Sequence, residues 1–204
     1  MSKDRVTVIK SVNYSEADKI LTVFGKYNGK FSIMAKGIRK ITSKNRGNMQ
    51  TLSTSEISYY EGKGLPILTE SQLISSPDID SHINIENIER LLYVLNKFLV
   101  EGEQNKEIFK LLQAVLQEDL SIDRINKFRL KVLKVLGFLS DFEVCSSCHS
   151  TDNLEYFDPK AFSVLCKNCY PTKSKGVKLS KHIYKDSSFT DSLDRYIKKI
   201  VEEI

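Results

Sequence analysis

The chain has 204 residues, 41% of them apolar, which is enough for one good hydrophobic core or two small ones. No stretch approaches about 18 consecutive apolar residues, and no apolar signal core follows the first residues, so we expect a cytoplasmic protein without a membrane span. The net charge is +5, but residues 1–50 contain eleven Lys or Arg and only three acids, which makes one end of the chain basic.

The first part of the chain shows the period-two alternation of short strands. We predict strands at residues 5–12, 19–26, 30–36, 52–60 and 66–74, with Asn28-Gly29 as a tight hairpin turn. The connection between the third and fourth strands, residues 37–51, is long, polar and basic. Five short strands with one long connection favour a small closed barrel, of which the oligonucleotide-binding (OB) barrel is a five-stranded example.

A basic run overlaps these strands. Seven Lys or Arg and no acid occur from Lys26 to Arg46. Such a run repels itself unless a polyanion or solvent relieves the charge, so nucleic acid is the first partner to consider. A solvated, solubilising face is the alternative.

After Pro77 the apolar residues fall at helical spacing and predict three helices that pack on one another. Gly102 separates the first two helices, and Gly137 closes the third. We predict a last amphipathic helix in the tail, capped by Thr190 or Asp191, and a short helical turn over residues 180–185. The stripes are Ile85, Ile88, Leu91, Leu92, Leu95, Phe98 and Leu99, then Ile108, Leu111, Leu112, Val115 and Leu116, then Ile125, Phe128, Val132, Val135 and Leu136.

The four cysteines form the most specific motif. Cys145 and Cys148 make one CxxC pair, and Cys166 and Cys169 make another. This spacing is typical of a tetrahedral zinc site, and a redox pair or unmetallated thiols are the alternatives. Four thiolates would fill the metal's shell and leave no position for a reactive water, so we expect one structural Zn²⁺. His149 is interpreted as a surface histidine.

No catalytic constellation is recognisable. The histidines His82, His149 and His182 are scattered, and there is no GxSxG, HExxH or phosphate-binding GxxxxGK[ST] motif. We therefore expect a binding protein and not an enzyme, with no small-molecule substrate.

The order of motifs resembles the bacterial recombination mediator family RecO. The residues that carry the likeness are Tyr14, the Glu-x-Asp at 16–18, Gly29-Lys30, the Ala-Lys-Gly-x-Arg at 35–39, the stretch 64–70 and the four cysteines. Many members carry Gly-Gly before the second cysteine pair, whereas Ala161, Phe162 and Ser163 stand here, so this hairpin is expected to turn differently. The chain is also shorter than usual for the family.

The resemblance implies an α+β protein: an OB barrel at residues 1–77, then a helical domain at 78–204 with a zinc segment at 145–169 and a C-terminal helix. It implies a bacterial, cytoplasmic and nucleoid-associated DNA repair protein that binds single- and double-stranded DNA and anneals complementary strands. By the same likeness it helps to load the recombinase onto DNA coated by single-strand-binding protein, in the RecF pathway. The implied partners are the ring-forming mediator RecR and single-strand-binding protein.

We assign the DNA contacts from charge and from aromatic character. The expected phosphate contacts are Lys26, Lys30, Lys36, Arg39, Lys40, Lys44 and Arg46. The candidates for base stacking are Tyr14, Tyr27, Tyr59 and Tyr60. The residues after 50 sum to a slightly negative charge, and we expect protein partners on that acidic scaffold.

Two other classes stay open. A zinc-ribbon transcription or RNA-binding factor would share the cysteines and the basic charge, but it needs neither a five-stranded barrel nor helices before the metal. A zinc-dependent nucleic-acid enzyme would need an open position on the metal, which four thiolates do not leave.

Overall fold

The computed structural model describes residues 1–78, 85–139, 142–170, 177–179 and 183–204. Contacts divide the chain into two compact units, Met1–Leu120 and Ser121–Ile204. The predicted domain limit at residue 77 therefore falls at the end of the barrel, while the first compact unit continues through two helices. Among the described residues, no helix combines the length and apolar character needed to cross a membrane.

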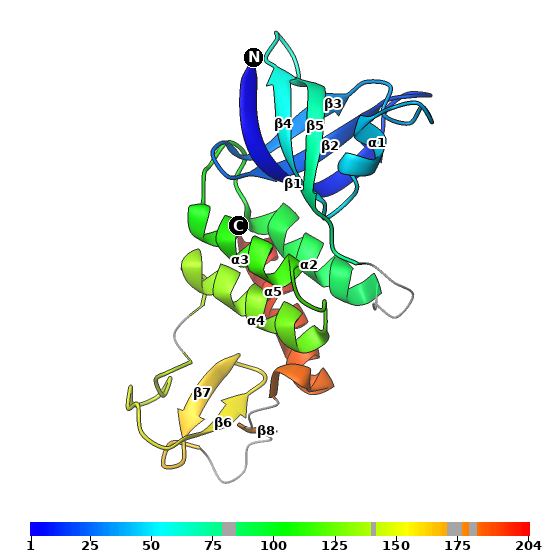
Figure 1. The fold of residues 1–204 in the computed structure, drawn as a ribbon. Coiled ribbons are helices and arrows are strands. Elements are labelled where there is room, and N and C mark those ends of the chain that lie inside the picture. Colours follow the sequence, from blue (N-terminus) through cyan, green and yellow to red (C-terminus); the bar gives the residue numbers. More distant parts are fainter. Residues whose placement is uncertain (79–84, 140–141, 171–176, 180–182) are drawn as a thin grey trace. The chain divides into compact units, whose positions relative to one another are not determined.

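The first unit contains the predicted barrel (Figure 1). Its strands are β1 (Ser2–Asn13), β2 (Lys19–Gly25), β3 (Gly29–Ala35), β4 (Thr54–Tyr60) and β5 (Ile67–Ser75). They close in the order β1-β2-β3-β5-β4, with β1 antiparallel to β4 and β3 parallel to β5. This is a closed five-stranded barrel, so the α+β class and the OB-type barrel are confirmed.

The barrel strands bury side chains on both faces. Val6 and Val8 point into the barrel core, and the core also takes residues from the connection between β3 and β4. Outside the barrel, Phe24 is fully buried, with its ring 5.7 Å from that of Phe109 on a helix. The core consists of Val6, Val8, Leu21, Val23, Ile33, Ala35, Ile38, Met49, Ile57, Tyr59 and Leu68.

Two helices, α2 (Ile85–Phe98) and α3 (Lys106–Leu116), cover this part of the barrel. Polar side chains fix them there. Gln113 Nε2 donates to the hydroxyl oxygens of Thr7 and Thr54, at 2.9 and 3.2 Å, and Asn96 Nδ2 donates to the carbonyl of Ile9 at 3.0 Å. Because these contacts satisfy buried or half-buried polar groups, we treat the barrel and the α2–α3 pair as one packed body.

The second unit combines a helix pair with a small sheet. Its elements are α4 (Ile122–Val135), β6 (Leu154–Asp158), β7 (Ser163–Cys166), β8 (Val177–Lys178), the 3₁₀ helix η1 (Ile183–Lys185) and α5 (Ser187–Glu203). The sheet order is β7-β6-β8. Asn126 on α4 donates to the Thr190 hydroxyl on α5 at 2.9 Å, and the buried Arg129 pairs with Asp194. These polar contacts join α4 to α5.

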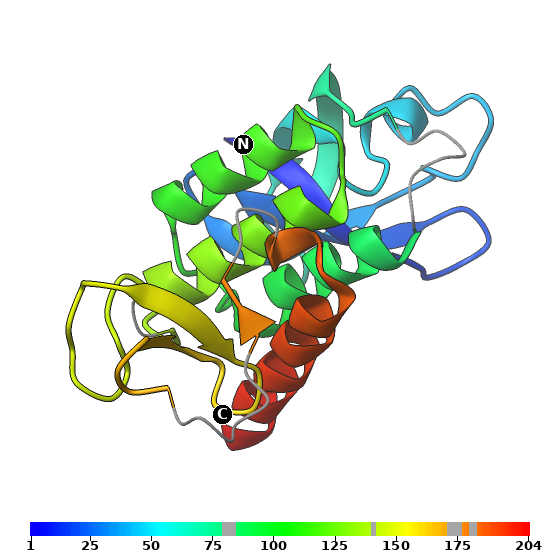
Figure 2. The same cartoon turned by 90° about the horizontal axis from the view of Figure 1, so that it is seen from below.

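An aromatic cluster joins the small sheet to α5, beside which the β6–β7 hairpin lies in Figure 2. The ring of Phe162 lies 5.3 Å from that of Phe157, 5.7 Å from Phe189 and 4.7 Å from Tyr196. The cysteine-bearing segment thus packs part of its apolar surface against a helix that lies outside it in sequence.

The last helix begins earlier than the sequence predicts. Its N-cap is Asp186, whose carboxylate accepts the backbone N–H groups of Ser188 and Phe189 at 2.7 and 3.4 Å. The bond from the Ser188 hydroxyl is the main reason that the pKa of Asp186 lies below its ordinary value. The predicted caps Thr190 and Asp191 are therefore wrong, and Thr190 is buried inside the helix. The predicted turn over 180–185 is seen as η1, and residues 180–182 lie outside the described part.

Candidate nucleic-acid interface and metal centre

The basic loop, residues 36–53, connects β3 to β4 and is anchored on the neighbouring β1–β2 turn, residues 14–18. Gly37 N–H donates to the Asp18 carboxylate at 2.7 Å, and Arg39 N–H donates to the Ala17 carbonyl at 2.9 Å. The Arg39 guanidinium donates to the Ser15 carbonyl at 2.7 Å. Hydrogen bonds thus join the segment that contains the Glu-x-Asp motif to the segment that contains the Ala-Lys-Gly-x-Arg motif.

Two buried side chains and a short helix also fix the basic loop to the barrel. Ile38 and Met49 are buried in the barrel core, 3% and 2% exposed. The short helix α1 (Asn45–Asn48) lies beside β5 in Figure 1, where the Asn48 side chain donates to the Ser71 carbonyl at 2.8 Å. The segment between these anchors carries exposed Lys40 and Lys44.

A polar cavity of about 360 Å³ lies at this end of the barrel. We call it the loop-end cavity; its lining residues are Asn13, Lys19, Ile38, Arg39, Arg46, Met49 and Gln50. Three of these residues are cations and none is an acid. Such a lining favours an anion, because a partly enclosed site of one charge sign strengthens the local potential.

Lys19 is the residue that the sequence interpretation missed. It lies outside the acid-free run, but it pairs with Asn13 on β1 and with Ala35 on β3. That register places Lys19 at the barrel end where the basic loop begins. The predicted strand limits could have shown that Lys19 lies near the basic loop. Residue 19 starts one predicted strand and residue 36 ends the next, and these two ends lie side by side in a hairpin.

The structure separates the predicted phosphate contacts into groups. Lys36, Arg39, Lys40, Lys44 and Arg46 all belong to the basic loop and are exposed. Lys26 lies at the other end of the β2–β3 hairpin, about 20 Å away at the usual rise per residue. It lines a different cavity, and its Nζ lies 5.0 Å from the centre of the Tyr27 ring.

Lys30 does not belong with the other lysines. Its Nζ donates to the Asn96 carbonyl on α2 at 3.0 Å. Burial lowers the pKa of Lys30, and the charge of Glu101 opposes this shift. Lys30 thus links the barrel to α2, and its expected contact with a DNA phosphate stays a prediction that is weaker than for the lysines of the basic loop.

The four tyrosine candidates also differ. Tyr14, Tyr27 and Tyr60 are 64%, 54% and 60% exposed. Tyr59 is only 3% exposed: its ring packs 5.6 Å from that of Phe31, and its hydroxyl accepts a hydrogen bond from the Asn28 side chain. Tyr59 is therefore a core residue, and the prediction that it stacks on bases is corrected.

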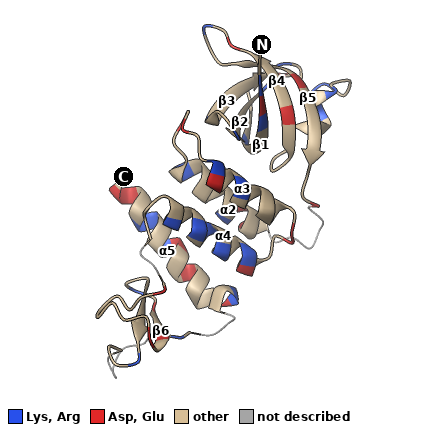
Figure 3. Ribbon diagram, turned by 60° about the vertical axis from the view of Figure 1, so that its left-hand side comes forward, with Lys and Arg blue, Asp and Glu red and all other residues tan. Residues whose placement is uncertain are grey.

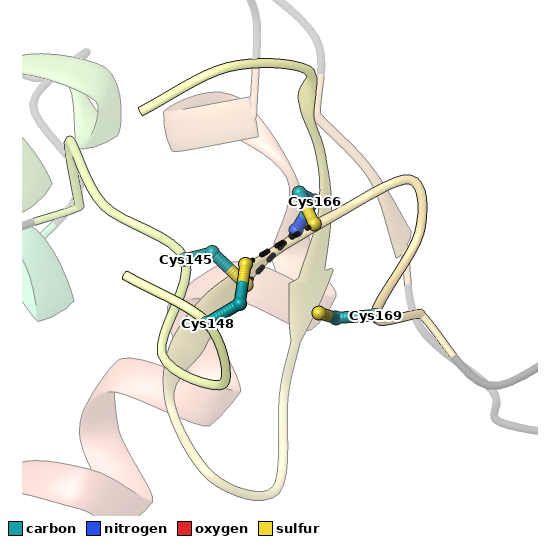
Figure 4. A group of neighbouring side chains, drawn as sticks. All are labelled: Cys145, Cys148, Cys166 and Cys169. Carbon is teal, nitrogen blue, oxygen red and sulfur yellow. Dashed lines mark hydrogen bonds between the residues drawn. The ribbon is translucent and has the colours of Figure 1, made fainter. Parts of the chain in front are cut away.

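The four cysteines converge in the second unit (Figure 4). All four sulfur atoms lie within 4.8 Å of one another. Cys148 Sγ and Cys166 Sγ are 3.7 Å apart, and a tetrahedral Zn–S bond of about 2.3 Å requires sulfurs about 3.8 Å apart. The donor set and its spacing therefore fit a closed tetrahedral zinc site, while exposed His149 is not part of the cluster.

Two tight turns present these thiols. In the first, His149 N–H donates to the Cys145 carbonyl at 2.9 Å, and His149 takes the left-handed conformation with φ 59°. In the second, Cys169 N–H donates to the Cys166 carbonyl at 3.2 Å. Ser146 N–H donates to the Val164 carbonyl on β7 at 2.9 Å and ties the first turn to the sheet.

Backbone donors prepare one thiol for metal binding. Burial raises the pKa of Cys145, but N–H groups of Cys166, Cys148 and Ser147 outweigh this and lower the pKa to about 6. Hydrogen bonds with the thiols of Cys148 and Cys166 raise the pKa of Cys169 to about 12. A shared cation would remove this competition, because metal binding displaces the remaining thiol protons.

The two halves of the chain match two family models. Residues 1–77 match the N-terminal domain of recombination protein O, and residues 90–185 match its C-terminal domain. The DNA repair protein RecO of Syntrophomonas wolfei is 30% identical over 190 residues, which cover 88% of this chain and 74% of that protein. RecO of Dehalococcoides mccartyi is 28% identical over 207 residues, which cover 91% and 79% of the two chains.

A further relative, RecO of Halalkalibacterium halodurans, is 27% identical over 184 residues, which cover 87% of this chain and 72% of that protein. An OB-type barrel with a basic loop, followed by helices and a four-cysteine cluster, is typical of a nucleic-acid-binding protein. Within that class, the chain belongs to the RecO family of recombination and DNA repair proteins.

Proposed function

We propose that this chain is a recombination mediator that contacts the phosphate backbone of single- and double-stranded DNA through its basic loop. The observation that carries the proposal is the loop-end cavity, lined by Lys19, Arg39 and Arg46 without an acid. Contacts with the phosphate backbone do not depend on the base sequence of the DNA, as a mediator that acts anywhere on DNA requires.

The proposed activity includes annealing of complementary strands. Two strands repel one another through their phosphates, and a protein that neutralises part of each lets them meet without any covalent chemistry. In the same proposal the chain acts in the cytoplasm at the nucleoid and helps to load the recombinase onto coated single strands. Its partners there are RecR and single-strand-binding protein.

The proposed DNA contacts follow the grouping of the side chains. The phosphate contacts are Lys19, Lys36, Arg39, Lys40, Lys44 and Arg46. Tyr14 is the preferred stacking residue, because it is exposed in the turn to which Arg39 is bonded. Lys26 with Tyr27, together with Tyr60, are secondary contacts on other parts of the barrel.

The metal in this proposal is one structural Zn²⁺ held by Cys145, Cys148, Cys166 and Cys169. Four thiolates complete its shell, so the metal stabilises the fold and activates no water. The zinc-ribbon factor is less well supported, because it requires neither the barrel nor the helices α2 and α3 that are part of this chain.

The function is tested by the salt dependence of DNA binding. The variant Lys36→Ala, Lys40→Ala, Lys44→Ala removes three exposed charges and keeps the loop anchors Ile38 and Arg39. We expect weaker binding to every sequence and a log–log salt slope that falls by about 2 for single strands, if each lysine neutralises one phosphate. Fluorescence anisotropy at several salt concentrations measures both quantities.

The matched control removes the same number of positive charges from another part of the chain. Lys97→Ala, Lys106→Ala, Lys110→Ala removes three exposed lysines from α2 and α3. This control should keep the wild-type slope. Equal slopes for wild type and the loop variant would show that the DNA site lies elsewhere, and strong selectivity for one operator or for ribosomal RNA would favour the zinc-ribbon factor.

A further inference from the structure

Ile41 stands out among the apolar side chains of the described residues. It is 90% exposed, more than Met1 at the chain start (79%) or Ile204 at its end (72%). A single exposed apolar residue needs no explanation by itself. The position of Ile41 does need an explanation, because Ile41 follows Lys40 and precedes Lys44 on the basic loop.

The anchors of the loop bring Ile41 out of the fold. On one side Ile38 is buried in the barrel core and Arg39 is bonded to the β1–β2 turn; on the other side Ser43 N–H donates to the Lys40 carbonyl at 3.0 Å. Ile41 therefore lies in a short turn whose base is fixed on the barrel. Its exposure is a property of that turn and does not arise from a frayed chain end.

We propose that Ile41 is an apolar wedge that inserts between neighbouring bases of the DNA whose phosphates the basic loop neutralises. This inference rests on the proposed function and names how the same site treats the bases. Apolar side chains such as isoleucine unstack base steps when flanking cations hold the backbone close to them. Insertion also takes the exposed side chain out of water, which the free protein does not achieve.

The positive charges around Ile41 indicate which kind of molecule its side chain contacts. A polyanion with apolar faces between its charges is complementary to an apolar residue between cations. An apolar groove on a protein would satisfy Ile41 but not the cations around it, and it would leave the loop-end cavity without an anion. Binding of a protein partner is thus one outcome that the test separates from the wedge.

The test uses Ile41→Ser in the full-length protein and a single-stranded oligonucleotide with 2-aminopurine inside a run of adenines. Stacking quenches this probe, so the wild-type protein should raise its fluorescence by opening the step. Ile41→Ser should bind about tenfold more weakly, equivalent to about 1.4 kcal/mol, with the salt slope unchanged and the fluorescence rise lost. Ile41→Phe should restore both.

The matched control is Leu65→Ser, which makes a similar change at a 41% exposed residue in the β4–β5 loop, at the far end of β4. It should behave as wild type, and neither serine variant should alter thermal unfolding. Wild-type affinity and fluorescence for Ile41→Ser would overturn the wedge while leaving the charge-based site intact. A wild-type protein whose DNA binding shows no salt dependence would instead overturn the proposed function.

Discussion

Replacing Cys148 by serine is expected to remove the bound metal and to unfold the cysteine-bearing segment, while the barrel stays folded. Cys148 is exposed, so the substitution removes a metal ligand with little loss of packing. Structural zinc contributes roughly 10–16 kcal/mol of apparent binding free energy in zinc-finger peptides, so loss of one of four ligands should cost several kcal/mol. Metal content and thermal unfolding measure the effect.

The neighbouring substitution His149→Ser is the matched control, since His149 is exposed and outside the sulfur cluster. It should retain one zinc per chain. Wild-type protein treated with a chelator should unfold like Cys148→Ser, and both should keep the wild-type salt slope for DNA. Full stability without metal would show that the cluster does not act as a structural zinc site.

Phe162 should tolerate glycine better than alanine, which is the reverse of the usual order. Phe162 takes the left-handed conformation with φ 49°, although its ring is only 2% exposed. Truncation of a buried phenylalanine to alanine costs about 3–5 kcal/mol. Glycine loses the same ring but relieves a backbone conformation that costs a side-chain-bearing residue about 1–2 kcal/mol.

Phe157 provides the comparison for this pair of variants. It lies in the same aromatic cluster, is 1% exposed and belongs to the extended strand β6. There glycine should be worse than alanine, because an extended backbone gives glycine no advantage. Urea unfolding of the second unit, measured for the alanine and glycine variants at Phe162 and Phe157, gives the order of stability of the two variants at each position. The same order at both positions would mean that the backbone at Phe162 is not strained.

The strands were predictable because their signal is local. Alternation and turn residues placed all five barrel strands to within two or three residues at each end. The exception in the pattern is informative: the buried run from Val6 to Ile9 does not alternate, because helices cover the barrel there. One sequence shows such a run but not which element covers its second face.

The four-cysteine cluster and the proposed DNA site differ in how much of each could be predicted from the sequence. Spacing alone identified the four cysteines that cluster in space. The basic residues could be counted from the sequence but not oriented. Lys30 turned toward α2, Tyr59 turned into the core, and Lys19 joined the loop-end cavity through strand register. Each of these outcomes depends on contacts between distant residues.

The charge distribution also needs a correction. Residues 51–120 contain five Lys or Arg and twelve acids, whereas residues 121–204 contain fifteen Lys or Arg and eleven acids. Figure 3 shows basic residues recurring along α4 in the second unit. The acidic surface expected on the scaffold therefore belongs to the barrel's own compact unit, and the search for protein partners that prefer acidic surfaces begins at β4, β5, α2 and α3.

The packing of α2 and α3 on the barrel sets where this protein can be cut. A fragment that ends at residue 77 would leave Phe24 facing water and would remove the Gln113 partner of Thr7 and Thr54. Thr7 and Thr54 would keep only the hydrogen bond between their own hydroxyls. Exposed apolar surface of this kind favours aggregation over binding. We therefore expect a fragment of residues 1–120, which keeps the whole first compact unit, to be a better test of the proposed DNA binding than a fragment of residues 1–77.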